Sequence, residues 1–561
     1  MATVRNIRFL VVGLSLSLVA LAQHPGPIGG ASQSAGQVGG SGAREPEPLI
    51  VTGVWTAAHS PYVLHQDVHV VNLTIEPGVE VVADPGVEIV VLGKLVAQGE
   101  SDATIHFHNA SAQGRWDGLR FQQASGNSAL VWCRIDGSQS SGVEIVDSTV
   151  SLQDCEISDN ESATYGGGIS AGIATGDLVL ERCVLFANSA AWGGAGIDAQ
   201  LPNGQLVLDG CQVSGNLANP DGETAFVQGG GVRCSDSLAL YVTGSTIEDN
   251  LVRAHSGYGS RAEGGGIWVQ DTPLAIELSV VESNALDSWC DGGYCDAGAY
   301  GGGLYVKDST TSMTLTIVRE NRVETNVVPF SGFNKESCGS SGGGIFVDND
   351  GVIFEASNCA FAGNEVKSTC KWNGSYAGGL YFAGNGPGSD LFLTNCVVAR
   401  NRSVDGGWYA GGGGPILPGV VVQYGSPGGY QGGDGRIQNT IATENVGCRL
   451  TWGDPNSPCF VDPQQALVLY PPAIQPVNYS IFENSTVGGV GNLVVEPQFV
   501  GLGTTVHDLG LASTSPAIDA GNPNPAYEDV SFPPSQGTAR NDMGIDGGPL
   551  AGGWSMLPTT P

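Results

Sequence analysis

The sequence predicts an all-β fold, a right-handed parallel β-helix with a C-terminal capping segment, on three observations. Nine asparagines recur along the middle of the chain at the same position of a repeated pattern. The residue five places before each one is Cys, Ser or Thr, and the residue three places before is apolar. Blocks of glycine alternate with these asparagines, and such repetition is typical of a solenoid. The asparagines are Asn160, Asn188, Asn216, Asn250, Asn284, Asn321, Asn364, Asn401 and Asn445.

Each repeat predicts the same elements in the same order. The glycine blocks, such as residues 166–168 and 264–266, allow the positive φ angles of a tight corner and open a strand. The residues before each asparagine, such as 178–180 and 183–185, predict two short strands joined by a turn. Equivalent positions of successive coils then lie above one another, so stacked asparagine side chains can bond to each other and to the backbone. We therefore interpret the asparagine column as structural and not catalytic.

The chain begins with a predicted secretory signal peptide. Arg5 and Arg8 precede an apolar run, and residues 20–22 form a small-x-small cleavage site. No later segment is long and apolar enough to cross a membrane, so we expect a secreted or cell-surface protein. The predicted parts are the signal peptide (1–22), a flexible Gly/Ser/Pro-rich lead-in (23–48), the parallel β-helix (49–500) and a C-terminal cap and tail (501–561).

The net charge limits the classes of partner. The formal net charge is −33, although only 14% of the residues are charged. An acidic surface of this kind repels nucleic acid at long range, so we expect no nucleic-acid partner. A polysaccharide or a cell-surface component is the expected partner, and the oligomeric state does not follow from the sequence.

The thirteen cysteines fall into two groups. Cys133 lies in a strand-like run, and five further cysteines occupy the small position of the repeat, where we expect a buried column of free thiols. The others lie mainly in loops, and the pairs 290 with 295, 338 with 370 and 448 with 459 would be local disulfides, leaving Cys234 over. Connectivity does not follow from spacing alone, so this pairing is a hypothesis. The five column cysteines are Cys155, Cys183, Cys211, Cys359 and Cys396.

The segments between each asparagine and the next glycine block vary in length, from residues 189–192 to residues 322–341. All emerge at one corner, so we expect them to stack as loops into one ridge, where repeat proteins often bind ligands. Their aromatic residues can stack on the apolar faces of sugars or anchor a protein partner. Alternatively, these rings pack on the solenoid wall and shield the corner. The candidate binding residues are Trp289, Tyr294, Tyr300, Trp372, Tyr376, Trp408 and Tyr409.

Four short phrases carry a family resemblance. LTIEPGV at residues 73–79 and WDGLRF at residues 116–121 resemble the opening coils of secreted bacterial right-handed parallel β-helix proteins of the pectin-lyase-like superfamily. SPAIDAG at residues 515–521 and RNDMG at residues 540–544 resemble the closing segment of the same proteins. The NCxFxxN and GGGI blocks resemble, more weakly, the repeats of polymorphic outer-membrane proteins. The resemblance covers most of residues 49–550 and implies a fold much more than an activity.

The resemblance implies that an enzyme of this superfamily would cleave acidic polysaccharide with Ca²⁺ held by carboxylates and a Lys or Arg base. We interpret residues 348–351 as a turn, and we interpret a second acidic set as a cap over the last coil, in which the side chains bond to backbone. No cofactor is predicted, and Ca²⁺ has no further support because it needs several converging oxygen ligands. The second set is Asp519, Asp529, Asp542 and Asp546.

Two further groups of residues are candidates for chemistry. A glycosidase needs two carboxyl groups about 5 to 9 Å apart, and five acidic residues precede column asparagines by one or two places. Their simpler interpretation is a solvated outward position. His106 and His108 flank Phe107 on a strand and share one face, which allows either a two-histidine metal site or ordinary exposed polar residues. The catalytic residues are therefore unknown and no metal site is predicted. The five acids are Asp159, Asp249, Glu282, Glu320 and Glu444.

The leading functional hypothesis is an exported, non-enzymatic protein that binds carbohydrate or another surface partner through its stacked aromatic residues. The alternative is a polysaccharide lyase or glycoside hydrolase that acts at the same ridge. A rigid spacer is the third hypothesis. Converging carboxylates beside a Lys or Arg would favour the enzyme, and solvent-facing tryptophans would favour the binding protein.

Overall fold

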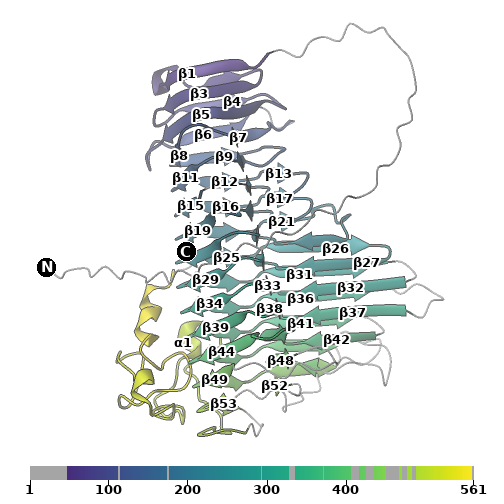
Figure 1. The fold of residues 1–561 in the computed structure, drawn as a ribbon, viewed down its shortest axis with the longest axis vertical. Coiled ribbons are helices and arrows are strands. Elements are labelled where there is room, and N and C mark those ends of the chain that lie inside the picture. The colour runs from purple at the N-terminus through teal and green to yellow at the C-terminus, as the bar shows by residue number, and fades with distance from the viewer. Residues whose placement is uncertain are drawn as a thin grey trace, which may run out of the picture. The chain divides into compact units, whose positions relative to one another are not determined.

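The computed structural model describes residues 47–110, 114–172, 176–291, 294–327, 335–369, 372–405, 416–424, 435–449, 467–469, 477–482 and 488–558. The described residues belong to one unit that starts at Glu47. The predicted signal peptide and nearly all of the lead-in lie outside the described residues, and so do Trp408 and Tyr409. Figure 1 shows the strands of this unit as a stack of coils.

The fold is an all-β parallel β-helix, which confirms the predicted fold class. Its largest sheet, sheet 1, has 25 strands in the described residues. Each strand pairs in parallel with the strand one coil away, as β11 does with β15. The long strand β5 pairs with two later strands, β7 and β8. The strands of sheet 1 are β1 (Leu49–Trp55), β3 (Val68–Ile75), β5 (Glu88–Gln98), β7 (Gly118–Gln122), β8 (Ser128–Val131), β10 (Val143–Val146), β11 (Val150–Gln153), β14 (Ile169–Gly172), β15 (Leu178–Glu181), β18 (Ile197–Gln200), β19 (Gln205–Asp209), β23 (Val232–Ser235), β24 (Ala239–Thr243), β28 (Ile267–Gln270), β29 (Leu274–Glu277), β33 (Leu304–Lys307), β34 (Thr311–Thr314), β38 (Ile345–Asn349), β39 (Ile353–Ser357), β43 (Leu380–Gly384), β44 (Asp390–Thr394), β48 (Val420–Tyr424), β49 (Arg436–Gln438), β52 (Leu467–Leu469) and β53 (Val477–Asn478).

Sheet 2 has 14 strands in the described residues and forms the other wall of the solenoid. Its strands are short, and their middle residues point inward: Val281, Val318 and Phe361 are buried in the same core as the inward residues of sheet 1. Alternate residues of a strand face opposite sides, so the period-two pattern read from the sequence produces this core. The strands of sheet 2 are β2 (Tyr62–Leu64), β4 (Glu80–Ala83), β6 (Ile105–Asn109), β9 (Cys133–Asp136), β12 (Glu156–Ser158), β16 (Val184–Phe186), β20 (Gln212–Ser214), β25 (Thr246–Glu248), β30 (Val280–Glu282), β35 (Ile317–Arg319), β40 (Ala360–Ala362), β45 (Val397–Ala399), β50 (Ile441–Thr443) and β54 (Ile481–Phe482).

The nine predicted asparagines form one hydrogen-bonded column. Nδ2 of Asn284 donates to Oδ1 of Asn321 at 2.9 Å and to the backbone oxygen of Ile247 at 2.9 Å. The backbone N–H of Asn284 donates to the same Oδ1 of Asn321, at 3.0 Å. This pattern continues from Asn160 through Asn401, whose Nδ2 donates to Oδ1 of Asn445. Each amide therefore satisfies buried backbone groups at the corner, where water has no access.

The predicted column of free cysteines is also present. Cys155, Cys183 and Cys211 are free and buried, and each thiol donates to a backbone oxygen two residues earlier. Further along the column the same place is taken by Ser245, whose Oγ accepts the backbone N–H of Cys211 at 3.0 Å. Cys234 is free as well, also as predicted.

The proposed disulfides are tested only in part. Cys290 forms a disulfide bond and so does Cys338, as the hypothesis requires. The side chains of Cys295, Cys370, Cys448 and Cys459 lie outside the described part of the structure. The pairing itself therefore stays a prediction.

The inserts after the asparagines are strands, so the prediction that they are loops is wrong. They form two further parallel sheets, sheets 3 and 4, with nine and six strands in the described residues. We call the pair the fin, and Figure 1 shows its strands β26 to β42 beside the main stack. The strands of sheet 3 are β13 (Glu161–Ser162), β17 (Ser189–Ala190), β21 (Leu217–Ala218), β26 (Leu251–Ser256), β31 (Ala285–Cys290), β36 (Arg322–Val327), β41 (Glu365–Thr369), β46 (Arg402–Asp405) and β51 (Val446–Arg449). The strands of sheet 4 are β22 (Phe226–Gln228), β27 (Gly259–Glu263), β32 (Tyr294–Tyr300), β37 (Lys335–Ser341), β42 (Trp372–Tyr376) and β47 (Ile416–Leu417).

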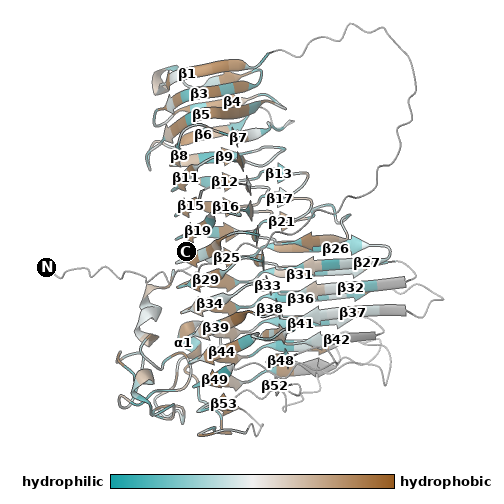
Figure 2. Cartoon of the chain, viewed as in Figure 1, coloured by the Kyte–Doolittle hydropathy of each residue, from teal (hydrophilic) through white to brown (hydrophobic). Residues whose placement is uncertain are grey.

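The two fin sheets bury a small core between them. Ala254 and Val323 of sheet 3 pack with Ala262 of sheet 4. Hydroxyls complete this interior: Oγ of Ser260 lies 2.8 Å from Oγ of Ser288. Figure 2 shows hydrophobic and hydrophilic residues following one another along β26 and β27. Such alternation predicts a strand, but the glycines and the variable lengths of the inserts made them resemble loops in the sequence.

The C-terminal segment lies along the flank of the solenoid. Its first described residues extend the last coil, where Leu493 bridges Ile481. The remainder packs Leu511, Ile545 and Trp554 against the outer face of sheet 2. This differs from the predicted cap over the last coil, because sheet 2 presents an apolar outer face to the segment. Its short helices are α1 (Val506–Leu509), η2 (Pro525–Tyr527) and η3 (Ala551–Met556), and η1 (Ala57–His59) lies in the first coil.

The acidic residues of this segment bond to backbone, as predicted. Asp542 accepts the backbone N–H of Asp519 at 2.8 Å on one oxygen and that of Gln536 at 2.8 Å on the other. Asp529 accepts the backbone N–H of Asp542 at 3.0 Å. Burial raises the pKa of Asp529 to about 7 and those of Asp542 and Asp546 to about 6.

Candidate functional site

A stack of aromatic rings runs along sheet 1 where the fin joins it. Strands β28, β33, β38 and β43 each begin after a glycine block, with one inward aliphatic residue followed by one outward aromatic residue. Successive ring centroids are 6.4, 5.4 and 5.1 Å apart, and the planes are within 9° of parallel. The rings belong to Trp268, Tyr305, Phe346 and Tyr381. The first three are at most 9% exposed, so the stack is a core that joins fin and solenoid.

Arg233 extends the stack by one coil. Its guanidinium lies 5.0 Å from the ring centroid of Trp268 and 4.4 Å from that of Tyr165. The same guanidinium pairs with the Asp198 carboxylate at 2.7 Å. The cation is therefore held between two rings and neutralised by a half-buried acid.

The outer face of sheet 4 covers this stack with a second set of rings. Tyr300 packs on Phe346 at 5.0 Å between centroids, and Tyr376 packs on Tyr381 at 6.3 Å. Both tyrosines are half-buried. They share their register position with Glu263 on β27.

A column of glycines lets these tyrosine rings lie flat on sheet 4. Gly298, Gly339 and Gly374 occupy one register position on three neighbouring strands. A Cβ atom on Gly298 would lie 2.9 Å from Cε2 of Tyr300, and one on Gly374 would lie 2.2 Å from Cε2 of Tyr376. Any larger residue would therefore lift the rings off the sheet.

The glycine column continues in Arg261 and then in Phe226 on the two preceding strands. Phe226 is 47% exposed. We call Phe226, Arg261, Tyr300 and Tyr376 the aromatic strip. It crosses β22, β27, β32, β37 and β42, so it runs along the direction in which the coils stack.

An ion pair between the exposed Arg261 and the buried Glu263 fixes the middle of the strip. The Nε of Arg261 donates to Oε1 of Glu263 at 2.5 Å, and its guanidinium lies 4.8 Å from the ring centroid of Tyr300. The other carboxylate oxygen of Glu263 accepts Nε1 of Trp268 at 2.9 Å and Nε2 of Gln228 at 3.1 Å. Burial raises the pKa of Tyr300, so this phenol stays neutral. Arg261, Glu263, Gln228 and Trp268 are thus linked by hydrogen bonds, which makes this part of the strip rigid.

Of the seven predicted binding residues, only Trp289, Tyr300 and Tyr376 have described side chains, and these three do not lie on one face. Tyr300 and Tyr376 lie in the strip. Tyr294 and Trp372 begin strands β32 and β42 of the same sheet, but their side chains lie outside the described part. Trp289 belongs to sheet 3, the other sheet of the fin. Its ring stacks on His255 at 4.9 Å and lies close to Gly222, so it is half-buried.

The sequence carried a signal for the rings that we missed. Four glycine blocks read GGGIW, GGGLY, GGGIF and GGLY, and the aromatic residue stands at the same place in each. An outward aromatic recurring once per coil predicts a stack in register. Phe226 carries no comparable signal, because it stands at this position in one coil alone.

Four of the five carboxylates considered for glycoside hydrolysis have structural partners. Asp159 pairs with Arg115 at 3.2 Å, and Glu282 pairs with Arg319. Glu444 pairs with Arg400 at 2.5 Å. Glu320 accepts the hydroxyl of Thr504 at 2.5 Å from the C-terminal segment. Asp249 stands at the turn before Asn250 with a φ of 53°, and no side-chain contact brings it to another of these acids.

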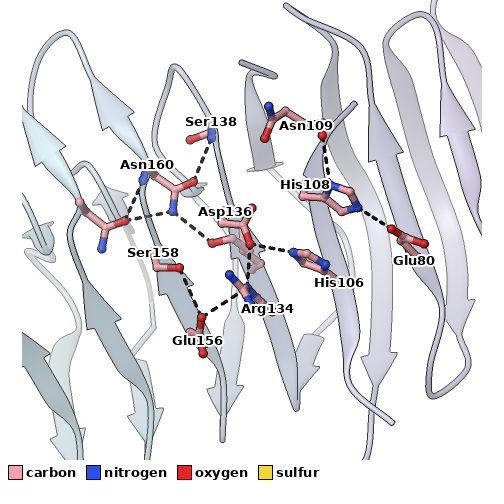
Figure 3. A network of polar contacts seen from close by, with 12 residues as sticks. Glu80, His106, His108, Asn109, Arg134, Asp136, Ser138, Glu156, Ser158 and Asn160 are labelled. Carbon is pink, nitrogen blue, oxygen red and sulfur yellow. Dashed lines mark hydrogen bonds and ion pairs between the residues drawn. The ribbon is translucent and has the colours of Figure 1, made fainter. Parts of the chain in front are cut away.

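His106 and His108 lie side by side on the outer face of sheet 2, as predicted (Figure 3). Their rings stack at 4.2 Å, and each bonds to a different carboxylate: His106 to Asp136 at 2.7 Å and His108 to Glu80 at 2.9 Å. Burial opposes the charge of Asp136, but the bond from His106 brings the pKa of this carboxyl below its usual value. Nowhere in the described ranges do three His, Cys, Asp or Glu side chains converge as a metal site.

Comparisons with known proteins leave the assignment at the level of the fold. No protein-family model matches the chain, and no curated protein matches it. Within the described residues, no helix has the length and apolar character needed to span a membrane.

Proposed function

We propose that the protein is an exported or cell-surface β-helix protein that binds carbohydrate, without catalysis, through the aromatic strip of sheet 4. The resemblance of residues 73–79 and 116–121 supports placing it in the pectin-lyase-like superfamily. The signal-like residues 1–22 support export.

The observation that carries the proposal is the set of flat rings beside a column of glycines. Tyr300 and Tyr376 lie against sheet 4 over Gly298 and Gly374, and Phe226 is half-exposed on the same face. Aromatic rings presented in this way offer apolar faces on which sugar rings stack. The buried stack beneath holds the tyrosines in place, so little conformational freedom is lost on binding.

The enzymatic alternative has less support. Four of the five carboxylates first considered for hydrolysis pair with Arg115, Arg319 and Arg400 or with Thr504, away from the strip. At the strip itself, Glu263 already accepts bonds on both oxygens. No observation brings two unengaged carboxyl groups together there.

A glycan array probed with the full-length protein and with Phe226→Ala tests the proposal. We expect retention of specific glycans by the wild type and a loss of about tenfold in affinity for the variant. Tyr241→Ala is the matched control, because Tyr241 is 42% exposed on β24, outside the strip. An absorbance assay on the bound glycans should detect no unsaturated product. Product formation would instead support the lyase alternative, and equal retention by Phe226→Ala would refute the proposal.

A further inference from the structure

We infer that the aromatic strip binds a neutral, extended glycan that lies along the coil stack. This inference rests on the proposed function, because it names the ligand class of the same site. It rests on the charges around the strip, on its flanking polar groups and on its direction.

Among the described side chains of the outer face of sheet 4, the strip has one cation, and that cation is already paired; the side chain of Lys335, at the start of β37, lies outside the described part. Arg261 is the one cation of that set, and its charge is engaged by Glu263 and by the face of Tyr300. The further charged residue of this face, Asp296, is acidic and exposed. Among these described side chains, a uronate or sulfate would therefore meet an excess of negative charge, from Glu263 and Asp296 against Arg261, within a chain of net charge −33.

The polar groups that flank the rings suit neutral hydroxyls. Asp296 and Ser337 occupy the register position next to Gly298 and Gly339, two residues earlier on each strand. Oγ of Ser337 donates to Oδ1 of Asp296 at 2.7 Å. A carboxylate with accepting capacity beside an apolar ring is a good partner for sugar hydroxyls, since charge-assisted hydrogen bonds are strong.

The direction of the strip selects an extended chain. Its residues stand on successive strands, from Phe226 on β22 to Tyr376 on β42. Five strands at the usual spacing cover about 19 Å. A linear oligosaccharide laid across the strands would meet a ring, the Arg261 side chain or a flat glycine backbone at each coil, whereas a single sugar would meet one or two rings.

The test compares neutral linear oligosaccharides of increasing length with oligogalacturonides and alginate oligomers, by calorimetry at low and at high salt. Phe226→Ala, Asp296→Ala and the control Tyr241→Ala are measured with the wild type. We expect neutral chains to bind with an affinity that rises with length and changes little with salt. Asp296→Ala should lose several-fold in affinity for neutral chains, and Phe226→Ala about tenfold.

The outcomes separate the two proposals. Preferential binding of the acidic oligomers, or a gain in affinity for them in Asp296→Ala together with steep loss in salt, would overturn the neutral-ligand inference and leave carbohydrate binding standing. Failure of both classes to bind, or binding that Phe226→Ala leaves unchanged, would refute the proposed function itself. Phe226 and Asp296 are exposed, so these variants test the site without disturbing the buried stack.

Discussion

The outer face of sheet 2 has two halves that differ in composition while sharing one backbone plan. One register position runs unbroken along the sheet from β4 to β54. In the first half, from β4 to β25, this position carries mostly polar residues, and we call this part the open half. In the second half, from β30 to β54, it carries only apolar residues, which the C-terminal segment covers, and we call this part the covered half. In order, the residues are Glu80, His106, Arg134, Glu156, Val184, Gln212, Thr246, Val280, Ile317, Ala360, Val397, Ile441 and Ile481.

The difference shows which part of the repeat is fixed by the fold and which part is available for docking. The inward residues and the asparagine column are apolar or amide in both halves, because every coil must bury them. The outward position is free to vary, so its residue type depends on whether solvent or another segment lies against it. In the open half the network of His106, Arg134 and Asp136 is in contact with solvent, and in the covered half Ile441 is buried under Gly544.

The largest expected effect comes from truncating the covered half. Ile441→Ala removes a fully buried side chain that packs with Met543 and Ile545, and we expect the free energy of unfolding to fall by about 3 kcal/mol. Glu156→Ala at the equivalent position of the open half should change it by less than about 0.5 kcal/mol. Urea denaturation followed by fluorescence gives both values. Equal losses would mean that the C-terminal segment contributes no burial.

A second, smaller effect should be the same in both halves. Asn188→Ala and Asn364→Ala each remove an Oδ1 that accepts two N–H donors from the neighbouring coil. Each leaves those buried donors unsatisfied, which costs about 2 kcal/mol. The measurement is again urea denaturation.

The partly exposed polar residues Gln212 and Ser214 on β20 provide a matched control for the asparagine variants, with substitution to Ala expected to be near neutral. A much larger loss for Asn364→Ala would show that the covering segment and the column are energetically coupled. In that case the two halves would differ inside the solenoid as well as on its surface.

The sequence predicts the shared plan well and the surface features poorly. Asn284 and Val281 recur once per coil, and a feature repeated in every coil is visible as a period. The fin was missed because its inward residues, such as Ala254 and Ser288, are small and mildly polar. A segment that alternates such small residues with polar ones has the composition of a loop. It forms a strand here because the neighbouring coils provide hydrogen-bond partners for its backbone.

The candidate site depended even more on tertiary structure. Tyr300 and Tyr376 could be picked as aromatic residues in an insert, but not as rings lying on glycines of adjacent strands. The same reasoning picked Trp289, which the turn of the insert places on the opposite fin sheet. The sequence does not show where the turn of an insert falls, so it does not show whether a residue joins sheet 3 or sheet 4. The covered flank was missed because Ile317 is an apolar residue next to the inward Val318, and the sequence alone does not show that Ile317 faces outward against another segment.

The last expected effect is a local one that separates the halves by pH. Burial raises the pKa of Asp529 to about 7 and of Asp546 to about 6, both in the segment that covers the second half. A carboxyl whose pKa is higher in the folded than in the unfolded chain binds its proton more tightly when folded. Its contribution to stability is therefore complete at low pH and is lost as the pH rises through about 6 to 7. Hydrogen exchange should accordingly show the amides of β40, β45 and β50 opening more often at pH 8 than at pH 5.

Asp546→Asn tests the cause of this pH dependence. The variant keeps an oxygen that can accept the backbone N–H of Leu511, as Oδ2 of Asp546 does at 2.6 Å, but it no longer titrates. We expect the difference in exchange between pH 5 and pH 8 to shrink at β40 to β50. The open half supplies the internal reference. Burial also raises the pKa of Glu88 on β5 to about 7, so the reference amides are those of β12 and β16, which lie further along the solenoid. Equal pH dependence at β12 and at β45 would show that the carboxylates of the covering segment are not its source, because a local titration can loosen only the strands on which its segment lies.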